Sequence, residues 1–366
     1  MTCGPAARRR PQETRRHPRS RCDRASSVVG ADAACGSLFR GGAGLGPCHP
    51  DRKDAPMQLN ATVFAVLGLV LTCPAQDAAK PRTERISVPS AAVAAAVTVA
   101  VHLPAGYDTE RERRYPVIFF LHGAGRGSER TWAQRGTNET VAKLVDQKKM
   151  PPCIIVCPRD AGRMTFYINW KGQQTQRHAD FITAELPAYI DEKYRTLKGR
   201  SFRALMGDSM GGFGALVNAL RHPQAFGTVS AHEPAIYPED IESLPSWIRR
   251  GGRGRGSILA RLFGDPLDET YWLEHNVFHI AKTAKKGAFK DLPIYFDVGE
   301  NDRYGLDQTC PPWSKLLKEK GVKHTFHLRP GGHGSRFFAA AVPSSLEFHG
   351  RHFEAALRRA ASLKDK

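Results

Sequence analysis

Residues 202–216 read FRALMGDSMGGFGAL, and their centre, Gly207-Asp208-Ser209-Met210-Gly211, fits the pattern G-x-S-x-G. The apolar residues before this centre predict the end of a buried strand, and residues 214–220 predict the helix that follows. Ser209 then lies on a turn so sharp that glycine must flank it on both sides. It also lies at the N-terminal end of a helix, where unpaired N–H groups favour negative charge. The stretch therefore predicts a serine nucleophile for acyl transfer.

A serine hydroxyl attacks at neutral pH only with the help of a base and of an acid that orients the base. In a strand–turn–helix setting of this kind, the acid and then a histidine follow the serine along the chain. Asp302 follows the apolar run 292–298 and His333 follows the run 324–328, so both are expected past the carboxyl end of a strand. We predict His333 as the base and Asp302 as the acid. The alternatives for the acid are Asp297, inside the strand, and Glu300, early in the turn.

A third apolar run, residues 115–121, ends in a loop that begins His122-Gly123-Ala124-Gly125. Such a loop after an early strand can direct a backbone N–H at the oxyanion of a tetrahedral intermediate, and the N–H of Met210 can supply a second donor. Gly123 and Ala124 are the candidates for the first donor. Taken alone the loop is an ordinary glycine-rich turn, so its interpretation depends on Ser209.

Four segments together resemble the esterase D family of α/β-hydrolases, over roughly residues 84–358. They are Leu121-His122-Gly123, Gly207-Asp208-Ser209-Met210-Gly211-Gly212, the turn 299–302 and Pro330-Gly331-Gly332-His333. That family includes feruloyl and acetylxylan esterases, tributyrin-type esterases, S-formylglutathione hydrolases and mycolyltransferases. The resemblance implies the α/β-hydrolase fold, with Ser209 as nucleophile, Asp302 as acid and His333 as base. Ser230-Ala-His-Glu-Pro and the Arg-Gly tract 249–256 depart from the family pattern, which leaves the substrate open.

Strand and helix patterns alternate along the chain from residue 84. An antiparallel pair is predicted near residues 85–88 and 95–103, and apolar residues at helical spacing predict an amphipathic helix over 178–194. The alternation predicts an α/β fold with a mainly parallel sheet and helices on both faces. Short helices predicted at 258–262 and 271–275 indicate a small cap insertion that sets specificity.

Three residues are predicted to contact substrate: Trp170, His122 and His232. Trp170, like Trp272, is a candidate wall for an aromatic or sugar group, although a tryptophan is also a common core residue. His232 and Glu233 follow a strand. They either line the pocket or form a structural hydrogen-bonding pair.

The N-terminal part of the chain differs from the rest. Residues 1–56 are rich in Arg, Pro, Gly and Ala without a hydrophobic period, and this composition predicts disorder. The apolar run 61–72 is too short for a membrane span and suits the core of a signal peptide over residues 57–75. The alternative is a buried helix or strand. We expect Met57 to be the native start, residues 82–366 to form the esterase domain, and the protein to be secreted or periplasmic.

The charge and the cysteine content indicate which binding partners and cofactors to expect. The 366 residues carry a formal net charge of +18, and 41% of them are hydrophobic, which is enough for one large domain. Apart from the tract 249–256, which we interpret as a flexible insertion rather than an RNA contact, the basic residues are scattered. We therefore expect no nucleic-acid partner and no stable membrane insertion. Cys153 and Cys157 lie in an apolar strand and are predicted to be core residues, and no metal site or other cofactor is implied.

The predicted function is hydrolysis of carboxylic esters through an acyl-enzyme. The signal-like segment suggests acyl or feruloyl esters of carbohydrate as substrates. The alternatives are an acyltransferase with the same residues and a thioesterase similar to S-formylglutathione hydrolase. A catalytically silent binding module is the alternative from another class, and intact Ser209, Asp302 and His333 argue against it. The sequence leaves the oligomeric state open.

Overall fold

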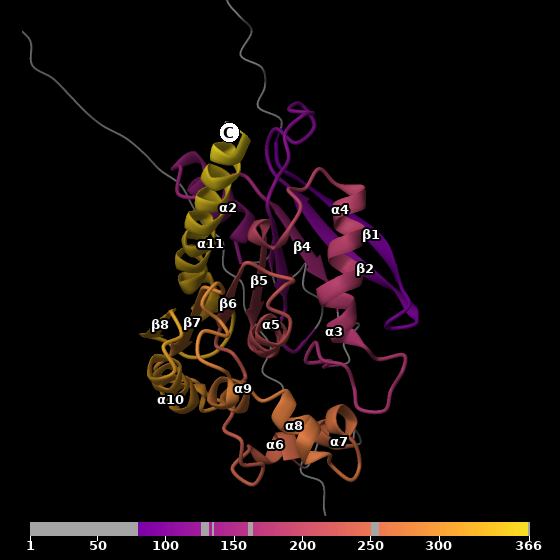
Figure 1. The fold of residues 1–366 in the computed structure, drawn as a ribbon, viewed down its shortest axis with the longest axis vertical. Helices are drawn as coiled ribbons and strands as arrows, with labels where there is room; N and C mark the ends of the chain where they lie inside the picture. The colour runs from indigo at the N-terminus through magenta and orange to yellow at the C-terminus, as the bar shows by residue number, and fades with distance from the viewer. Residues whose placement is uncertain (1–79, 126–131, 134, 160–163, 250–255, 365–366) are drawn as a thin grey trace, which may run out of the picture. The chain divides into compact units, whose positions relative to one another are not determined.

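The computed structural model describes residues 80–125, 132–133, 135–159, 164–249 and 256–364. The predicted disordered extension, the signal peptide and most of the Arg-Gly tract lie outside these residues. Eight strands form one sheet in the order β1-β2-β4-β3-β5-β6-β7-β8 (Figure 1). The strands are β1 (Arg82–Ser90), β2 (Ala95–Leu103), β3 (Val117–Leu121), β4 (Ile154–Pro158), β5 (Arg203–Asp208), β6 (Thr228–His232), β7 (Ile294–Gly299) and β8 (His324–Arg329).

The sheet is mainly parallel, as the sequence predicts. β1, β2 and β4 pair antiparallel, and every pairing from β4 through β3 to β8 is parallel. β3 and β7 are buried along their whole length, which explains why their sequences are almost continuously apolar. β8 forms the edge and is partly exposed. The parallel strands bring their carboxyl ends to one edge of the sheet, where the predicted site residues follow them.

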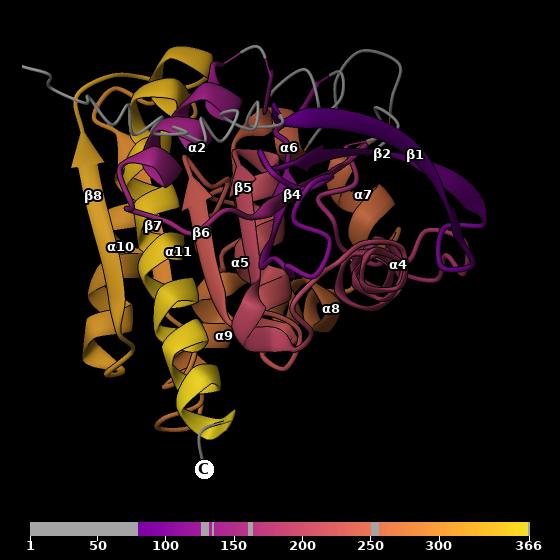
Figure 2. The ribbon, with the colours of Figure 1, turned by 90° about the horizontal axis from the view of Figure 1, so that it is seen from above.

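Helices cover both faces of the sheet (Figure 2). Ile118 and Phe120 of β3 pack into one apolar cluster with Leu144 of α2 and Phe338 of α11, while Phe119 packs into the other cluster. Successive residues of a strand point to opposite faces, so one apolar strand contributes to both cores. The helices named here are α2 (Thr137–Asp146), α5 (Met210–Arg221), α10 (Leu306–Glu319) and α11 (Ser335–Lys364).

The closing segment is a single helix. α11 runs for 30 residues and continues through Pro343. Phe338, Val342 and Leu346 recur every four residues and are fully buried, so they form one stripe against the sheet. This long apolar stripe keeps the helix continuous although a proline removes one backbone hydrogen bond.

The helix predicted over 178–194 is present with one irregular turn. It consists of α3 (His178–Asp180), a π-helical turn (Phe181–Glu185) and α4 (Leu186–Lys193). Glu185 in the π turn accepts hydrogen bonds from the Ser90 hydroxyl and from the N–H of Ala92 (3.0 Å). The extra residue of the turn thus serves to anchor the connection between β1 and β2.

The predicted cap insertion contains four short helices. Among the described residues these are α6 (Ser246–Arg249), α7 (Ile258–Phe263), α8 (Glu269–Glu274) and α9 (Val277–Thr283), which lie between β6 and β7 in the chain, and a separate 3₁₀ turn, η2 (Arg200–Phe202), leads into β5. Trp272 is buried in α8, and its indole N–H donates to the carbonyl oxygen of Glu239 (2.8 Å), so it is a core residue rather than a pocket wall. Among the described residues, no helix is both long and apolar enough to cross a membrane.

Candidate active site

The turn that carries Ser209 joins β5 to α5. Ser209 has φ 55° and ψ −113°, a conformation that a residue other than glycine adopts only when its surroundings hold it there. A side chain at Gly207 would overlap the backbone of Gly211, and one at Gly211 would overlap the carbonyl group of Leu121. The two glycines therefore let β3, β5 and α5 approach closely enough to form the turn.

The end of β6 fixes the backbone of Ser209. The N–H of Ser209 donates to the carbonyl oxygen of His232 (2.9 Å), and the carbonyl oxygen of Ser209 accepts from the N–H of Ala235 (3.1 Å). The Ser209 residue nevertheless stays partly exposed. These backbone hydrogen bonds offset the strain of the turn, while the hydroxyl remains accessible to a substrate.

The structure brings the predicted nucleophile, base and acid together from three loops. Ser209 Oγ lies 2.9 Å from His333 Nε2, and Asp302 Oδ2 lies 2.7 Å from His333 Nδ1. The side chains of His333 and Asp302 are 6% and 0% exposed, so water competes little for these bonds. When Asp302 accepts a hydrogen bond from the Nδ1–H group of His333, the histidine presents an unprotonated Nε2 to the serine hydroxyl. This is the arrangement that a base for Ser209 requires.

The geometry separates Asp302 from the two alternatives. Asp297 is fully buried in β7 and belongs to a different hydrogen-bonding network, and Glu300 is exposed. The second carboxylate oxygen of Asp302, Oδ1, accepts the N–H of Tyr304 (2.8 Å), which fixes the carboxylate toward His333. Asp302 is therefore the acid that the structure places beside the histidine.

Two backbone hydrogen bonds tie the loop of the acid to the loop of the base. The N–H of Glu300 donates to the carbonyl oxygen of Arg329 (2.8 Å), and the N–H of Asn301 donates to the carbonyl oxygen of Gly331 (2.9 Å). These bonds extend the pairing of β7 with β8 beyond the strand ends. The distance between the acid and the base is thus set by the backbone of two neighbouring strands.

The loop after β3 lies beside the serine. A Cβ atom at Gly123 would lie 3.2 Å from the Cβ of Ser209 and 3.3 Å from the carbonyl oxygen of Asp208, so the approach requires a residue without a side chain. Met210 is the first residue of α5, and its N–H has no acceptor within the helix. The positions of Gly123 and Met210 fit the predicted oxyanion donors, and Ala124 follows Gly123 directly. The catalytic role of these N–H groups stays a prediction.

The side chain of His122 supports this loop. It is 1% exposed, and its Nδ1 lies 2.6 Å from the carbonyl oxygen of Gly123. The hydroxyl of Tyr167 donates to the carbonyl oxygen of His122 (3.1 Å), and the two rings pack edge to face. A ring this deeply buried offers no surface to a substrate, so the predicted substrate contact through the His122 side chain is corrected to a structural role.

Trp170 packs between the segment before α3 and the cap. Its indole N–H donates to the carbonyl oxygen of Thr165 (3.4 Å), and the guanidinium of Arg261 lies 5.2 Å from its ring centre. Trp170 remains partly exposed. Its predicted role as a pocket wall stays a prediction.

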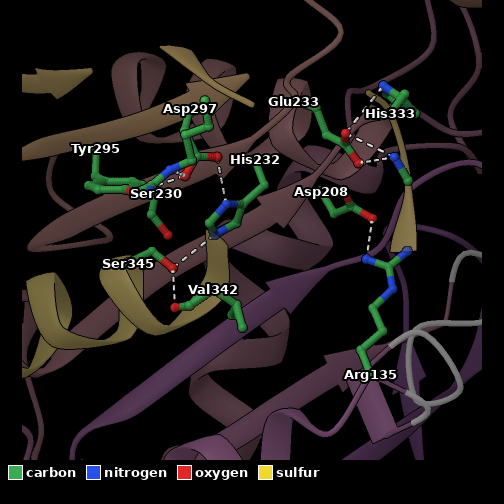
Figure 3. A network of polar contacts seen from close by, with 12 residues as sticks. Arg135, Asp208, Ser230, His232, Glu233, Tyr295, Asp297, His333, Val342 and Ser345 are labelled. Atoms are coloured by element: carbon green, nitrogen blue, oxygen red, sulfur yellow. Dashed lines mark hydrogen bonds and ion pairs between the residues drawn. The ribbon is translucent and has the colours of Figure 1, made fainter. Parts of the chain in front are cut away.

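His232 is the clearest correction to the predicted site. Its side chain is fully buried, Nδ1 lies 2.7 Å from Asp297 Oδ1, and Nε2 lies 2.8 Å from Ser345 Oγ (Figure 3). A ring with both nitrogens occupied and no exposed surface cannot bind substrate. Of the two interpretations left open, the structural hydrogen-bonding role is the correct one for His232.

Two further polar residues lie next to the predicted trio. Arg135 forms an ion pair with Asp208 (2.9 Å), and their side chains are only 11% and 4% exposed. Glu233 is fully buried, and its carboxyl oxygens accept the N–H of Gly334 at 2.7 and 2.9 Å. Glu233 Oε2 also lies 3.6 Å from His333 Nδ1. In the sequence, Glu233 could have been noticed because it lies in a segment that departs from the family pattern. No sequence pattern pointed to Arg135.

Burial raises the pKa of Glu233 to about 10. The negative charge of Asp208 acts in the same direction, as does that of Asp302, whereas the N–H of Gly334 acts against them. A buried carboxyl next to other carboxylates keeps its proton because a further charge would be neither solvated nor paired. The surroundings of Glu233 therefore favour the neutral carboxylic acid at neutral pH.

Among the described residues, one group of side chains resembles a metal site. Glu233, Asp302 and His333 place three potential ligand atoms within 4.8 Å of one another. Both nitrogens of His333 and both oxygens of Glu233 already have hydrogen-bond partners. A cation would have to displace these bonds, so we assign no metal site.

A cavity of about 520 Å³ lies on the far side of Tyr167. The first residues of β2, the end of β4 and the segment that leads into α3 line it, and its polar groups include Thr165, Gln176 and His178. Tyr167 connects the cavity with the loop after β3, because its hydroxyl donates to the carbonyl oxygen of His122. The residues that line the cavity include none of Ser209, Asp302 and His333 and none of the candidate oxyanion donors.

A mainly parallel sheet with a serine turn after β5, and an acid and a histidine after β7 and β8, defines an α/β-hydrolase. The sequence model of the Esterase family matches residues 90–349, and the chain belongs to this family. The match confirms the predicted fold and the resemblance to esterases.

Individual proteins agree with this assignment. The chain is similar to esterase MT1326 of Mycobacterium tuberculosis, with 29% identity over 252 residues, 64% of this chain and 52% of the relative. It thus spans about half the length of that relative. A solved ferulic acid esterase matches with a TM-score of 0.62 and 24% identity over 75% of this chain and 98% of the other. An S-formylglutathione hydrolase from Agrobacterium tumefaciens matches with a TM-score of 0.60 and 19% identity over 75% and 96%.

Proposed function

We propose that the protein is a serine carboxylic-ester hydrolase that acts through an acyl-enzyme. The observation that carries this proposal is the hydrogen-bonded series from Ser209 through His333 to Asp302 on a strained turn. Membership of the Esterase family supports an ester as the substrate.

In the first half of the reaction, His333 Nε2 takes the proton of the Ser209 hydroxyl as the serine oxygen attacks the ester carbonyl carbon. Asp302 holds the Nδ1–H of His333 and stabilises the imidazolium that forms. The N–H groups of Met210 and of Gly123 or Ala124 stabilise the oxyanion. When the tetrahedral intermediate breaks down, the C–O bond to the alcohol breaks, and the alcohol leaves with the proton from His333.

In the second half, water takes the place of the alcohol. His333 removes a proton from water, and the hydroxide attacks the acyl carbon attached to Ser209. The collapse of the second tetrahedral intermediate returns the proton to Ser209 and releases the acid. A sugar hydroxyl in place of water would give acyl transfer with the same residues.

For the substrate, we propose acyl or feruloyl esters of carbohydrate, with the protein acting after export. The support is the family resemblance, the name of the ferulic acid esterase whose fold is similar, and the signal-like segment 57–75. No nucleic acid or membrane takes part in this proposal.

Hydrolysis of a panel of esters by the protein from Gln76 onward tests the proposal. We expect p-nitrophenyl acetate, p-nitrophenyl butyrate and methyl ferulate to be cleaved, and Ser209→Ala to abolish cleavage. Preference for ferulate over butyrate supports the carbohydrate-ester proposal. Faster cleavage of S-formylglutathione would favour the thioesterase, and an acylated sugar as the main product would favour the transferase. Activity that survives in Ser209→Ala would contradict the serine mechanism.

A further inference from the structure

Glu233 lies next to two other polar groups of the candidate active site. On one side is the buried ion pair of Asp208 with Arg135, and on the other side is His333 (Figure 3). Glu233 directly follows His232, whose carbonyl oxygen accepts the N–H of Ser209. One dipeptide at the end of β6 therefore contacts the backbone of the nucleophile and the loop of the base.

The backbone of Glu233 is strained. Its φ is 38°, in the left-handed region that residues with a side chain rarely adopt. Its N–H donates to the carbonyl oxygen of Asp297 at 2.7 Å, which holds the residue in this conformation. Strain of this kind costs on the order of 1–3 kcal/mol and persists where the surrounding structure over-determines it. The fixed backbone holds the carboxyl group of Glu233 at one position, next to Asp208 and the N–H of Gly334.

The neighbouring Asp208 has a buried oxygen, Oδ1, that lacks a hydrogen-bond donor in the described part of the chain. Asp208 Oδ2 accepts from Arg135, but Asp208 Oδ1 is buried and has no hydrogen-bond donor among the described residues if every carboxyl is ionised. The side chains of Glu233 and Asp208 lie next to each other (Figure 3), and the charge of Asp208 raises the pKa of Glu233. Two carboxylates repel each other, whereas a carboxylic acid and a carboxylate share a proton. A proton on Glu233 therefore satisfies Asp208 Oδ1.

We propose that Glu233 is a positioning residue of this site: its protonated carboxyl donates to Asp208, accepts the N–H of Gly334, and so holds the loop of His333 against Ser209. The proposal rests on the proposed function, since it concerns the same three residues. It adds a fourth side chain, from the residue that follows β6, to the groups that set the geometry of the base.

The neutral form of Glu233 matters for His333 as well. Glu233 Oε2 lies 3.6 Å from Nδ1, and Asp302 Oδ2 lies 2.7 Å from the same nitrogen. The charged or titratable groups that surround Glu233 are Asp208, Asp302, His333 and, through Asp208, Arg135. An ionised Glu233 would compete with Asp302 for the Nδ1 proton and add a second negative charge beside the site of the oxyanion. A neutral Glu233 leaves Asp302 as the sole ionised partner of the imidazole.

Infrared spectroscopy tests the protonation state independently of activity. A protonated carboxyl has a C=O stretching band well separated from that of a carboxylate. At neutral pH, we expect the difference spectrum between the wild type and Glu233→Gln to show one such band, which shifts in D₂O. The difference between the wild type and Glu300→Gln, which alters an exposed glutamate of the neighbouring loop, should lack it. Absence of the band from the Glu233→Gln difference would overturn the proposal.

Steady-state kinetics tests the positioning role. Glu233→Ala removes both hydrogen bonds, and we expect kcat to fall about 10- to 100-fold with KM changed less than about threefold, because a small displacement of the base slows proton transfer. Glu233→Gln keeps a donor and an acceptor without charge, and should recover most of the lost kcat. Glu300→Gln serves as the control for a glutamate that does not face the site.

Each result decides the proposal. If Glu233→Ala retains kcat within about twofold of the wild type, or if Glu233→Gln is as slow as Glu233→Ala, the positioning role is wrong. If Glu233→Ala does not fold, the Glu233→Gln kinetics and the infrared band still decide it. Failure of the proposed function is distinguishable, because Ser209→Ala would then retain the activity of the wild type whatever the state of Glu233.

Discussion

Two Ser–His–Asp arrangements occur in the described part of the chain, and their internal distances are nearly the same. In the first, the histidine lies 2.9 Å from the serine and 2.7 Å from the aspartate. In the second, the distances are 2.8 and 2.7 Å. The first, the elbow trio, consists of Ser209, His333 and Asp302. The second, the buried trio, consists of Ser345, His232 and Asp297.

The surroundings of the two serines differ. Ser345 lies inside α11 without exposed surface, and its hydroxyl donates to the carbonyl oxygen of Val342 at 3.0 Å. Ser209 lies on a strained turn, is partly exposed, and has Gly123 beside it. An ester cannot reach Ser345, because its side chain is fully buried. The comparison teaches that the distances among three side chains do not define a hydrolytic site, whereas access, backbone strain and nearby N–H donors do.

The buried trio instead joins elements of the fold. Asp297 in β7 accepts hydrogen bonds from the hydroxyl of Tyr295 (2.8 Å) and from Arg329 Nε of β8 (3.2 Å) as well as contacting His232. Through Ser345 the network reaches α11. Its residues therefore hold β6, β7, β8 and α11 together, and their loss should reduce stability rather than change the chemistry.

The largest expected difference concerns the two serines. Ser209→Ala should lower kcat/KM by at least about 10⁴-fold, because it removes the nucleophile. Ser345→Ala should lower kcat/KM by less than about threefold and reduce the free energy of unfolding by about 1–3 kcal/mol, since Nε2 of His232 loses its partner. Ester hydrolysis and urea unfolding of both variants provide the measurement. Equal losses of activity would remove the distinction between the trios.

Substitution of Asp302 should mainly reduce activity, whereas substitution of Asp297 should mainly reduce stability. Asp302→Asn should lower kcat by about 10³- to 10⁴-fold with little loss of stability, because the amide no longer holds His333 in the productive tautomer. Asp297→Asn should destabilise the fold by about 3–5 kcal/mol, because it breaks a buried network. Kinetics at a temperature where both variants are folded, with unfolding curves in parallel, test this. A slow but fully stable Asp297→Asn enzyme would contradict it.

A smaller loss of kcat is expected when Gly123 is substituted. The buried trio has no residue that corresponds to this glycine. Gly123→Ala places a methyl group against Ser209 and Asp208 and should lower kcat by about 10- to 100-fold through displacement of the oxyanion loop. Gly256→Ala is the matched control, because a Cβ atom there meets no neighbour within 4 Å. The two variants are compared by kcat on p-nitrophenyl acetate. Indistinguishable values would show that the loop after β3 does not assist the reaction.

The smallest effect concerns His349, one turn along α11 from Ser345. Burial holds the pKa of His349 well below 6.5, and its Nε2 lies 2.8 Å from Ser230 Oγ. Because the folded pKa is lowered, stability is complete above about pH 6.5 and is lost as the pH falls, since only the unfolded chain takes up the proton. The loss is up to about 1.4 kcal/mol per pH unit. Urea unfolding between pH 7 and 5 should show a flatter dependence for His349→Gln, and an unchanged slope would refute the assignment.

The parts of the site's geometry that could be predicted from the sequence are those that local pattern controls. Glycines on both sides of Ser209 predicted the sharp turn, and apolar runs predicted the strands whose ends carry Asp302 and His333. Parallel strands align their ends, so residues 31 positions apart in sequence lie within hydrogen-bonding distance. The fold class followed from the same alternation of strands and helices.

The parts that the sequence did not predict depend on distant partners. His232 is structural because Ser345, 113 positions later, meets its ring, and the continuity of α11 that delivers Ser345 could not be expected across Pro343. Glu233 acquires its role from Gly334, 101 positions later, and from a positive φ that no local pattern requires. A histidine or glutamate after a strand has the same appearance in sequence whether it faces a pocket or a buried hydroxyl.

The placement of Ser345 and His349 on α11 has a practical consequence for work with this protein. The last residues of the helix are exposed, Leu363 by 74%, so a purification tag attached there should be tolerated. Shortening the chain into the helix would instead remove hydroxyl and imidazole partners from His232 and Ser230 in β6, the strand whose end holds Ser209. Cleavage that reaches Ser345 also removes Leu346 and Phe353, which are fully buried in the core beside the sheet. Preparations trimmed this far by proteases should therefore lose the fold and with it the esterase activity, although every residue of the elbow trio is still present.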